Sequence, residues 1–565
     1  MKKIVLMIAL VLPMAALACT NFIVGKAASA DGSTIVTYAA DSYGMFGFLH
    51  FSPAADYPEG AMREVKDWDT GRPQGFIPQV AHTYSVVGNM NEHQVTIGET
   101  TWGGREALWD TVGIDYGSLI YIALERSKTA REAIECFITL VNEYGYASEG
   151  ETFTIADPNE AWMMDLIGKG PGQKGANWVA VRIPDDAISG HANQSRITTL
   201  PLESKVKSRK SKEEKRLEKQ LNCVCHGDWM WDKDVIAFAR EKGYFTGEDK
   251  DFSFQAAYNP FDFSGLYVCE ARVWSFFNHF SDDMDRYFDY ATGEIFRATK
   301  GAHEGEHMPL WIIPNRKVSV QDMKECMRDE YKGTPLDITQ GTDAGPWNSK
   351  LRYGGLGFKC AVNGTDTLQY WYERPTATQQ TAWSYVSQMR PNSQYGIFWF
   401  GVDDAACSCY APMYSCIDRI PECFAEGNGD SYTYSPTSAW WTFNIVANWA
   451  YTKYSRMYPH IREAQQIWDD KFNTQTAGLD AKIAGMKDED ARAFLTNYSC
   501  SQAENLVADW QRLGIYLMTK FLDGQERKEE NGQFKRNPYG NSCGPNRLAL
   551  PEPFLKMVAP EITHE

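Results

Sequence analysis

Cys19 follows a segment with the features of a secretory signal peptide. A cationic start and an apolar run over residues 4–12 precede Ala16-Leu17-Ala18, which matches an A-x-A cleavage site. Cleavage after Ala18 would make Cys19 the first residue, so that one residue carries both a thiol and a free α-amine. Because the ordinary pKa is about 8.5 for a thiol and about 7.7–8.0 for an α-amine, the amine is suited to act as an internal base for the sulfur. The expected chemistry is nucleophilic attack by this thiol on a carbonyl carbon.

Two other interpretations of Cys19 stay open. In a lipoprotein both the amine and the thiol would be acylated. However, Ala16 and Leu17 stand in the opposite order to the usual lipoprotein site, and the chain continues into the β-rich residues 22–24 without a tether. A purely structural cysteine is not excluded by spacing. We therefore expect an exported protein, periplasmic or secreted, with a lipid anchor at Cys19 as the less favoured form.

The composition indicates a globular chain and disfavours some classes of partner. The 565 residues include 56 Lys and Arg against 73 Asp and Glu, a formal charge of −17, so binding to nucleic acid is not expected. After the leader there is no run of about 20 apolar residues, so no membrane span is expected. Of the 13 cysteines, twelve remain besides Cys19, an even number that permits disulfides without fixing their pairing. The oligomeric state is left open, a homo-oligomer included.

The pattern of apolar residues predicts a mixed α+β fold. A strand directly after Cys19, a turn at residues 30–33 and a second strand from residue 34 are typical of a hairpin. Further strands are predicted at residues 83–87, 94–98, 152–156, 161–166 and 178–183. Helices are predicted at residues 116–127 and 129–144 and, in the C-terminal third, at residues 439–458, 461–472 and 501–522. The densely charged residues 203–220 are expected to form a solvated surface segment. This order of strands and helices favours a layered architecture.

A second constellation, from His303 to His307 with Glu304 between them, fits the H-E-x-x-H pattern of zinc peptidases. That chemistry needs both histidines on one face of a stable helix, with the glutamate as base. Glycines and a proline crowd the segment, so a polar loop is the favoured interpretation. We therefore expect no metal and no organic cofactor, and a zinc peptidase using these three residues stays open as an alternative.

Seven segments along the chain form an ordered set, at residues 19–33, 91–101, 153–157, 160–162, 178–182, 192–197 and 438–444. The first reads CTNFIVGKAASADGS and the sixth reads ANQSRI. Together they resemble the N-terminal-nucleophile dipeptidases, which are cysteine peptidases related to penicillin V acylase and bile-salt hydrolase. The resemblance covers most of the chain.

The resemblance implies a four-layer αββα sandwich of the N-terminal-nucleophile hydrolases with extra C-terminal helices. It also implies hydrolysis through a thioester on Cys19. It matches Asp41 to an acidic residue that orients the α-amine. It matches Asn193 to the side-chain donor for the oxyanion, with a backbone N–H near Thr101 as the second donor. Arg272 is matched to the active-site arginine.

One position departs from the family pattern. The related dipeptidases carry an arginine where this chain has Tyr38, whose neutral hydroxyl cannot stabilise a thiolate by charge. Arg272 is the candidate to supply that charge instead. Tyr38 and Glu99 are expected to contact the substrate, and either Glu99 or Asp41 is expected to receive its ammonium group.

The sequence therefore predicts three parts. Residues 1–18 are a signal peptide, residues 19–435 a hydrolase domain with insertions, and residues 436–565 a C-terminal helical extension packed on the same unit. The predicted function is that of an exported cysteine dipeptidase acting on dipeptides or short peptides. An acyl-amide hydrolase of the same superfamily, the zinc peptidase and a non-catalytic binding protein on the same fold stay open.

Overall fold

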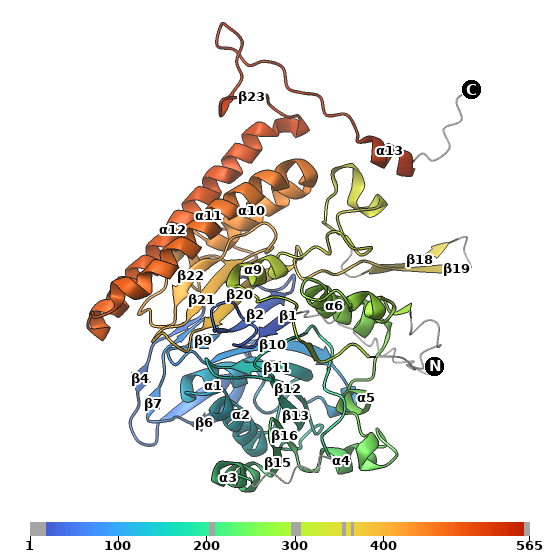
Figure 1. The fold of residues 1–565 in the computed structure, drawn as a ribbon, viewed down its shortest axis with the longest axis vertical. Helices are drawn as coiled ribbons and strands as arrows, with labels where there is room; N and C mark the ends of the chain where they lie inside the picture. Colours follow the sequence, from blue (N-terminus) through green and yellow to red (C-terminus); the bar gives the residue numbers. More distant parts are fainter. Residues whose placement is uncertain (1–18, 203–209, 295–306, 353–356, 363–365, 559–565) are drawn as a thin grey trace, which may run out of the picture.

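The computed structural model describes residues 19–202, 210–294, 307–352, 357–362 and 366–558. The chain forms two large antiparallel sheets that stack on each other, with helices on the outside of both (Figure 1). This arrangement confirms the predicted α+β class and its αββα layering.

The seven-stranded sheet contains the strand that follows Cys19. Its order is β17 (Trp311–Ile312), β14 (Ile188–His191), β1 (Thr20–Val24), β2 (Thr34–Asp41), β20 (Thr381–Met389), β21 (Ile397–Val402) and β22 (Ala411–Tyr414). β1 and β2 form the predicted hairpin, in which Thr20 lies opposite Ala39. Because β14 pairs with the other side of β1, the start of β1 is held between two strands.

The nine-stranded sheet lies against the first one, and its strands β10 and β11 contact β2. Its order is β15 (Cys223–His226), β16 (Trp229–Asp232), β13 (Ala176–Ile183), β12 (Ala161–Gly168), β11 (Gly150–Ala156), β10 (Thr96–Gly103), β9 (Met90–Asn91), β8 (Val86–Val87) and β3 (Phe51–Ser52). The single strand predicted at residues 83–87 is wrong. The chain changes partner there, since β7 (His82–Thr83) pairs with β4 (Ala55–Asp56) whereas β8 pairs with β3 and β9.

Three further pairs of strands lie outside the two large sheets. They are β5 (Met62–Lys66) with β6 (Pro73–Pro78), β18 (Gly357–Val362) with β19 (Asp366–Trp371), and β23 (Glu529–Glu530) with β24 (Gln533–Phe534). Short α-helices lie between these strands and near the carboxyl end. They are α3 (Lys212–Leu221), α4 (Val235–Glu241), α5 (Phe254–Tyr258), α6 (Ala271–Asn278), α7 (Phe288–Ala291), α9 (Val320–Met327) and α13 (Glu552–Val558).

Helices α1 (Tyr116–Arg126) and α2 (Ala130–Tyr144) cover the outer face of the nine-stranded sheet. Both agree with the predicted helices. The α2 helix begins where the Thr129 hydroxyl accepts a hydrogen bond from the backbone N–H of Glu132, a contact that satisfies one of the unpaired N–H groups of the first turn. The apolar faces of the two helices form a core with the strands beneath them.

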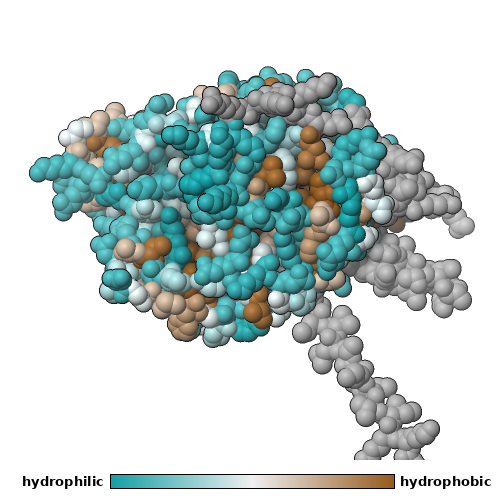
Figure 2. Space-filling model, turned by 90° about the horizontal axis from the view of Figure 1, so that it is seen from below, coloured by the Kyte–Doolittle hydropathy of each residue, from teal (hydrophilic) through white to brown (hydrophobic). Residues whose placement is uncertain are grey.

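Helices α10 (Ala439–Tyr451), α11 (Tyr454–Ile483) and α12 (Asp488–Lys520) lie on the outer side of the seven-stranded sheet (Figure 1). The helix predicted at residues 439–458 is interrupted at Thr452 and Lys453, where α10 ends and α11 begins. The face seen from the α3 side is largely hydrophilic, with small separate hydrophobic patches (Figure 2). Of the charged segment predicted at the surface, the residues from 210 onwards are described and include α3, while residues 203–209 lie outside the described part.

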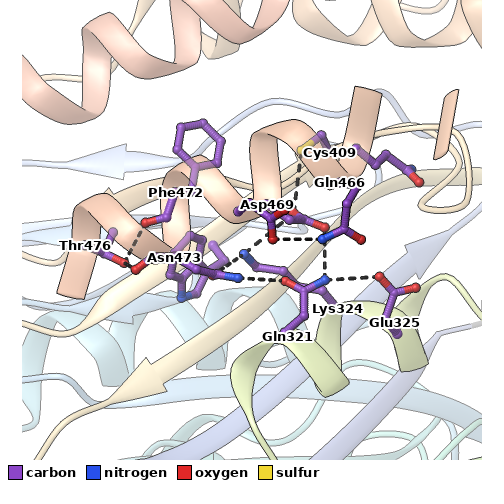
Figure 3. A network of polar contacts seen from close by, with 12 residues as sticks. Gln321, Lys324, Glu325, Cys409, Gln466, Asp469, Phe472, Asn473 and Thr476 are labelled. Carbon is purple, nitrogen blue, oxygen red and sulfur yellow. Dashed lines mark hydrogen bonds and ion pairs between the residues drawn. The ribbon is translucent and has the colours of Figure 1, made fainter. Parts of the chain in front are cut away.

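A buried ionic network joins α9 to α11 (Figure 3). The Asp469 carboxylate lies 2.6 Å from a guanidinium nitrogen of Arg328 and 3.8 Å from the Lys324 ammonium. All three side chains are buried, and Lys324 lies over the ring of Trp399 in β21 at 3.6 Å. Although burial opposes it, the charge of Arg328 and then that of Lys324 lower the pKa of Asp469 to about 2. The network therefore fixes the helix layer to the sheet.

We predict that Asp469→Ala destabilises the fold by about 3–5 kcal/mol, because it leaves two cations buried without their partner. The free energy of unfolding in urea measures this loss. Because the pKa of Asp469 is lowered in the folded protein, its contribution to the free energy of unfolding is complete above pH about 4 and declines as the pH falls towards 2. The difference in the free energy of unfolding between wild type and variant therefore narrows over that range.

The matched control is Asp470→Ala, which removes the neighbouring exposed carboxylate of the same helix. We expect this variant to stay within about 0.5 kcal/mol of wild type. Equal effects of the two substitutions would contradict a stabilising role for the network.

Candidate active site

Cys19 lies directly before β1, at the interface between the two sheets. The residue is only 2% exposed. Its neighbours along β1 pair on both sides, since Asn21 lies opposite His191 in β14 and opposite Tyr38 in β2. The thiol is therefore attached next to a strand that is hydrogen-bonded on both sides.

Arg272 connects the start of β1 to the loop after β14. One guanidinium nitrogen donates to the carbonyl of Cys19 at 2.7 Å and to the hydroxyl of Thr20 at 2.8 Å. The other donates to the carbonyl of Ala192 and to Oδ1 of Asn193, both at 3.0 Å. Arg272 follows a π-helical turn at Gly265–Glu270 and is fully buried. A planar guanidinium has the fork geometry needed to fix two backbone segments at once.

Asn193 holds the backbone nitrogen of Cys19. Its Oδ1 accepts a hydrogen bond from the backbone nitrogen of Cys19 at 2.9 Å, and its Nδ2 donates to the carbonyl of Thr101 at 2.6 Å. The residue has a positive φ of 62°, a conformation that asparagine tolerates better than most side chains. The predicted role as an oxyanion donor stays a prediction. In the structure the amide contacts the nucleophile on one side and β10 on the other.

The sulfur of Cys19 faces a buried tyrosine. It lies 3.4 Å from the hydroxyl of Tyr38, which in turn donates to Oε1 of Glu99 at 2.6 Å. Burial and then the charge of Glu99 raise the pKa of the Cys19 thiol well above its ordinary value, while hydrogen bonds from Tyr38 and from the backbone of Asp41 oppose that shift. The thiol is therefore neutral near pH 7 and needs a base before it can attack.

Asp41 contacts a cation that the sequence did not reveal. Its Oδ2 lies 3.0 Å from a guanidinium nitrogen of Arg374, and its Oδ1 accepts a hydrogen bond from the hydroxyl of Thr381 at 2.6 Å. Burial raises the pKa of Asp41, and these two partners act against it. The expectation was that this carboxylate orients the nitrogen of Cys19. The nitrogen of Cys19 contacts Asn193, whereas the Asp41 carboxylate contacts Arg374 and Thr381, so this role stays a prediction.

Glu99 stands next to a second buried carboxyl group. Glu151 in β11 accepts a hydrogen bond from the hydroxyl of Thr101 at 2.9 Å, and its carboxyl group is within hydrogen-bonding reach of Glu99 when one of the two is protonated. Burial raises the pKa of Glu99 to about 7. Burial and the charge of Glu99 raise that of Glu151 well above its ordinary value. The two carboxyl groups therefore titrate as a pair, which keeps at least one proton near neutral pH.

The structure brings all the predicted site residues to one place. Direct hydrogen bonds link most of them, namely Cys19, Tyr38, Glu99, Asn193, Thr101 and Arg272. The backbone of Asp41 faces the sulfur of Cys19. Sequence reasoning missed Arg374 and Glu151. Neither stands in a local pattern that marks it, since each reaches the site only through long-range strand pairing and side-chain contact.

The zinc alternative falls mostly outside the described residues, which resume at His307. Within the described part of the chain, no cluster of three or more His, Cys, Asp or Glu side chains is arranged to hold a metal ion. The sulfur atoms of Cys223 and Cys225 lie 3.8 Å apart on β15, and the cysteines whose side chains the structure describes, which excludes Cys360, are free thiols.

A stacked pair of antiparallel sheets between helix layers, with a buried cysteine at the start of a central strand, matches the N-terminal-nucleophile hydrolase fold that the resemblance implied. The sequence model of the protein family described as Peptidase family C69 matches residues 18–467 of this chain. The chain belongs to this family, which confirms the resemblance to the cysteine dipeptidases.

Three curated relatives agree with this family. A probable dipeptidase of Latilactobacillus sakei is 22% identical over 85% of this chain and 90% of its own length. A probable dipeptidase of Salmonella dublin is 23% identical over 57% and 68%, and a dipeptidase of Bifidobacterium longum is 23% identical over 72% of each. None of the helices in the described ranges is long and apolar enough to cross a membrane.

We predict that Arg272→Lys lowers kcat/KM by about 10- to 100-fold. Lysine keeps the charge but cannot bind two backbone segments in parallel, and each charge-assisted hydrogen bond that is lost is worth about 1.5–3 kcal/mol. Steady-state kinetics on a dipeptide measure the effect. Arg216→Lys, which changes a side chain 44% exposed on α3, is the control and should keep wild-type activity. An unchanged kcat/KM in Arg272→Lys would show that the fork is dispensable.

Proposed function

We propose that this protein is an exported cysteine dipeptidase, which hydrolyses dipeptides or short peptides through a thioester on Cys19 after removal of residues 1–18. The observation that carries the proposal is the 2.9 Å contact between the backbone nitrogen of Cys19 and Asn193 Oδ1. This contact holds the nitrogen, which becomes an α-amine on cleavage, at a defined position next to its own thiol. Membership of a peptidase family and the dipeptidase names of the relatives support the reaction and the small substrate.

In the first half of the proposed reaction the Cys19 sulfur attacks the carbonyl carbon of the peptide bond. A carbon–sulfur bond forms as the S–H bond breaks, the thiol proton passes to a base, and one electron pair of the carbonyl moves to the oxygen. Asn193 Nδ2 and a backbone N–H near Thr101 are the proposed donors to this oxyanion. In the resting enzyme Nδ2 donates to the Thr101 carbonyl, so the transition state replaces a neutral acceptor by a charged one. Loss of one such donor costs about 10²–10³ in rate.

In the second half the carbon–nitrogen bond breaks and the leaving amine takes a proton. Water then attacks the thioester, and the carbon–sulfur bond breaks to restore the free thiol. Arg272 contacts the carbonyl of Cys19 rather than its sulfur, so in this mechanism it positions the nucleophile and adds a positive charge nearby.

The ammonium group of the substrate needs an acidic partner. Of the two predicted candidates, Asp41 has both oxygens engaged, by Thr381 and Arg374. Glu99 also has one oxygen engaged, by Tyr38, so contact of either carboxylate with the ammonium group stays a prediction.

Export is supported by the A-x-A signal before Cys19. Mass spectrometry of the mature protein tests this part, since the proposal requires an unmodified Cys19 as the first residue. A retained leader or an acylated Cys19 would rule out the proposed nucleophile.

We predict that Cys19→Ala lowers kcat on a dipeptide panel by about 10³-fold or more, as expected when a covalent nucleophile is removed. Stoichiometric alkylation by iodoacetamide should abolish the activity of the wild type, and a chelator should leave it unchanged. Cys136→Ala, which removes a half-buried thiol of α2 far from the site in sequence, is the control and should stay active. Turnover of acyl amides but of no dipeptide would instead favour the acyl-amide hydrolase, and loss of activity with chelator the zinc peptidase.

A further inference from the structure

We propose that Tyr38 and Glu99 form a proton relay that takes the proton from the Cys19 thiol and later returns it to the leaving amine. The inference rests on the proposed thiol mechanism and assigns its acid–base step to side chains. Tyr38 is the catalytic residue of this relay because it touches the reacting sulfur. Glu99 acts through Tyr38.

The directions of the hydrogen bonds are those that a relay needs. The Tyr38 hydroxyl has one proton, and it donates that proton to Oε1 of Glu99 at 2.6 Å. The contact between the Tyr38 oxygen and the Cys19 sulfur at 3.4 Å must therefore use the S–H group as donor. Two protons thus point the same way along a chain of three groups, from sulfur to phenol to carboxylate.

The surroundings of Glu99 suit a proton acceptor. Its carboxylate accepts from Tyr38 on one oxygen and lies within hydrogen-bonding reach of the Glu151 carboxyl group. Other titratable groups that act on it or sense its charge are Cys19, Asp69, Tyr116 in α1, Tyr146 and Tyr385 in β20. Burial raises the pKa of Glu99 to about 7, and a base with a pKa near the working pH is the most effective.

Every proton is accounted for both when the thiol attacks and when the amine leaves. In the forward step the S–H bond breaks, the Tyr38 oxygen receives that proton, and the original Tyr38 proton moves to Glu99. The resulting thiolate accepts a hydrogen bond from Tyr38 as it attacks the substrate carbonyl. When the carbon–nitrogen bond breaks, Tyr38 gives its proton to the leaving amine nitrogen, and Glu99 returns its proton to the Tyr38 oxygen. Deacylation repeats the cycle with water in place of the thiol.

The relay accounts for the tyrosine that replaces the expected arginine. An arginine would stabilise a thiolate by charge, whereas Tyr38 carries no charge and links the sulfur to a carboxylate. All three groups are buried, so the alternative of a permanent thiolate would leave two anions, sulfur and Glu99, in a site of low polarity. Moving one proton along the relay leaves only one negative charge at any moment.

The experiment compares Tyr38→Phe, Glu99→Gln and the double variant in the mature protein, with a dipeptide as substrate. We expect each single variant to lower kcat by about 10²-fold, the lower range for general-base catalysis. The double variant should be no worse than the more affected single one, because the two residues act in one chain. Wild-type kcat should rise through pH about 7, the pKa range of Glu99, and in Glu99→Gln this rise should move towards about 8, the range of the α-amine.

Tyr385→Phe is the matched control. It removes another buried tyrosine hydroxyl of the same sheet, one that donates to the Ile97 carbonyl and not to the sulfur or Glu99, and it should keep the wild-type profile. Matching circular dichroism spectra and urea midpoints show that all variants are folded. An unchanged kcat and pH profile overturns the relay, and so does a Glu99→Gln variant that raises KM alone. Neither result affects Cys19 as the nucleophile, whose own test is the loss of activity in Cys19→Ala.

Discussion

The hydrogen bonds of one buried guanidinium determine the geometry of the site. Arg272 joins the carbonyl of Cys19 to the loop that carries Asn193, and Asn193 in turn joins the nitrogen of Cys19 to β10. Cys19, the loop after β14 and the second sheet are thereby connected through two side chains, Arg272 of α6 and Asn193. A buried guanidinium group destabilises the fold unless its N–H groups are hydrogen-bonded. The burial of Arg272 therefore depends on the carbonyl groups that accept its hydrogen bonds.

The reacting groups are divided between the two sheets. Cys19 and Tyr38 come from the seven-stranded sheet, whereas Glu99, Thr101 and Glu151 come from the nine-stranded sheet. The distance between the sulfur and its acidic neighbours is thus a property of how the sheets stack, which is set by the core between them. Residues that pack this core therefore influence the geometry of the site. The helix layer, which the ion pair of Asp469 with Arg328 holds in place, packs against the outer face of the seven-stranded sheet.

Much of the fold and most of the site residues could be predicted from the sequence. The hairpin β1–β2 and the helices α1 and α2 follow from local alternation, periodicity and capping, and Cys19 follows from the cleavage signal before it. Arg374 could not be predicted, because it stands 333 residues after Asp41 and no local pattern connects the two. Glu151 looks like an ordinary surface residue between Glu149 and Thr152. Only the pairing of β10 with β11 brings it opposite Thr101.

The position of Cys19 has a practical consequence for producing the enzyme. Its neighbour Thr20 is already paired with Ala39, and the proposed chemistry needs the nitrogen of Cys19 as a free amine. A retained initiator methionine or an amino-terminal affinity tag would turn the amine into an amide. The opposite end of the chain differs, since Leu555 and Val558 in α13 are 44% and 50% exposed. A purification handle therefore belongs at the carboxyl terminus.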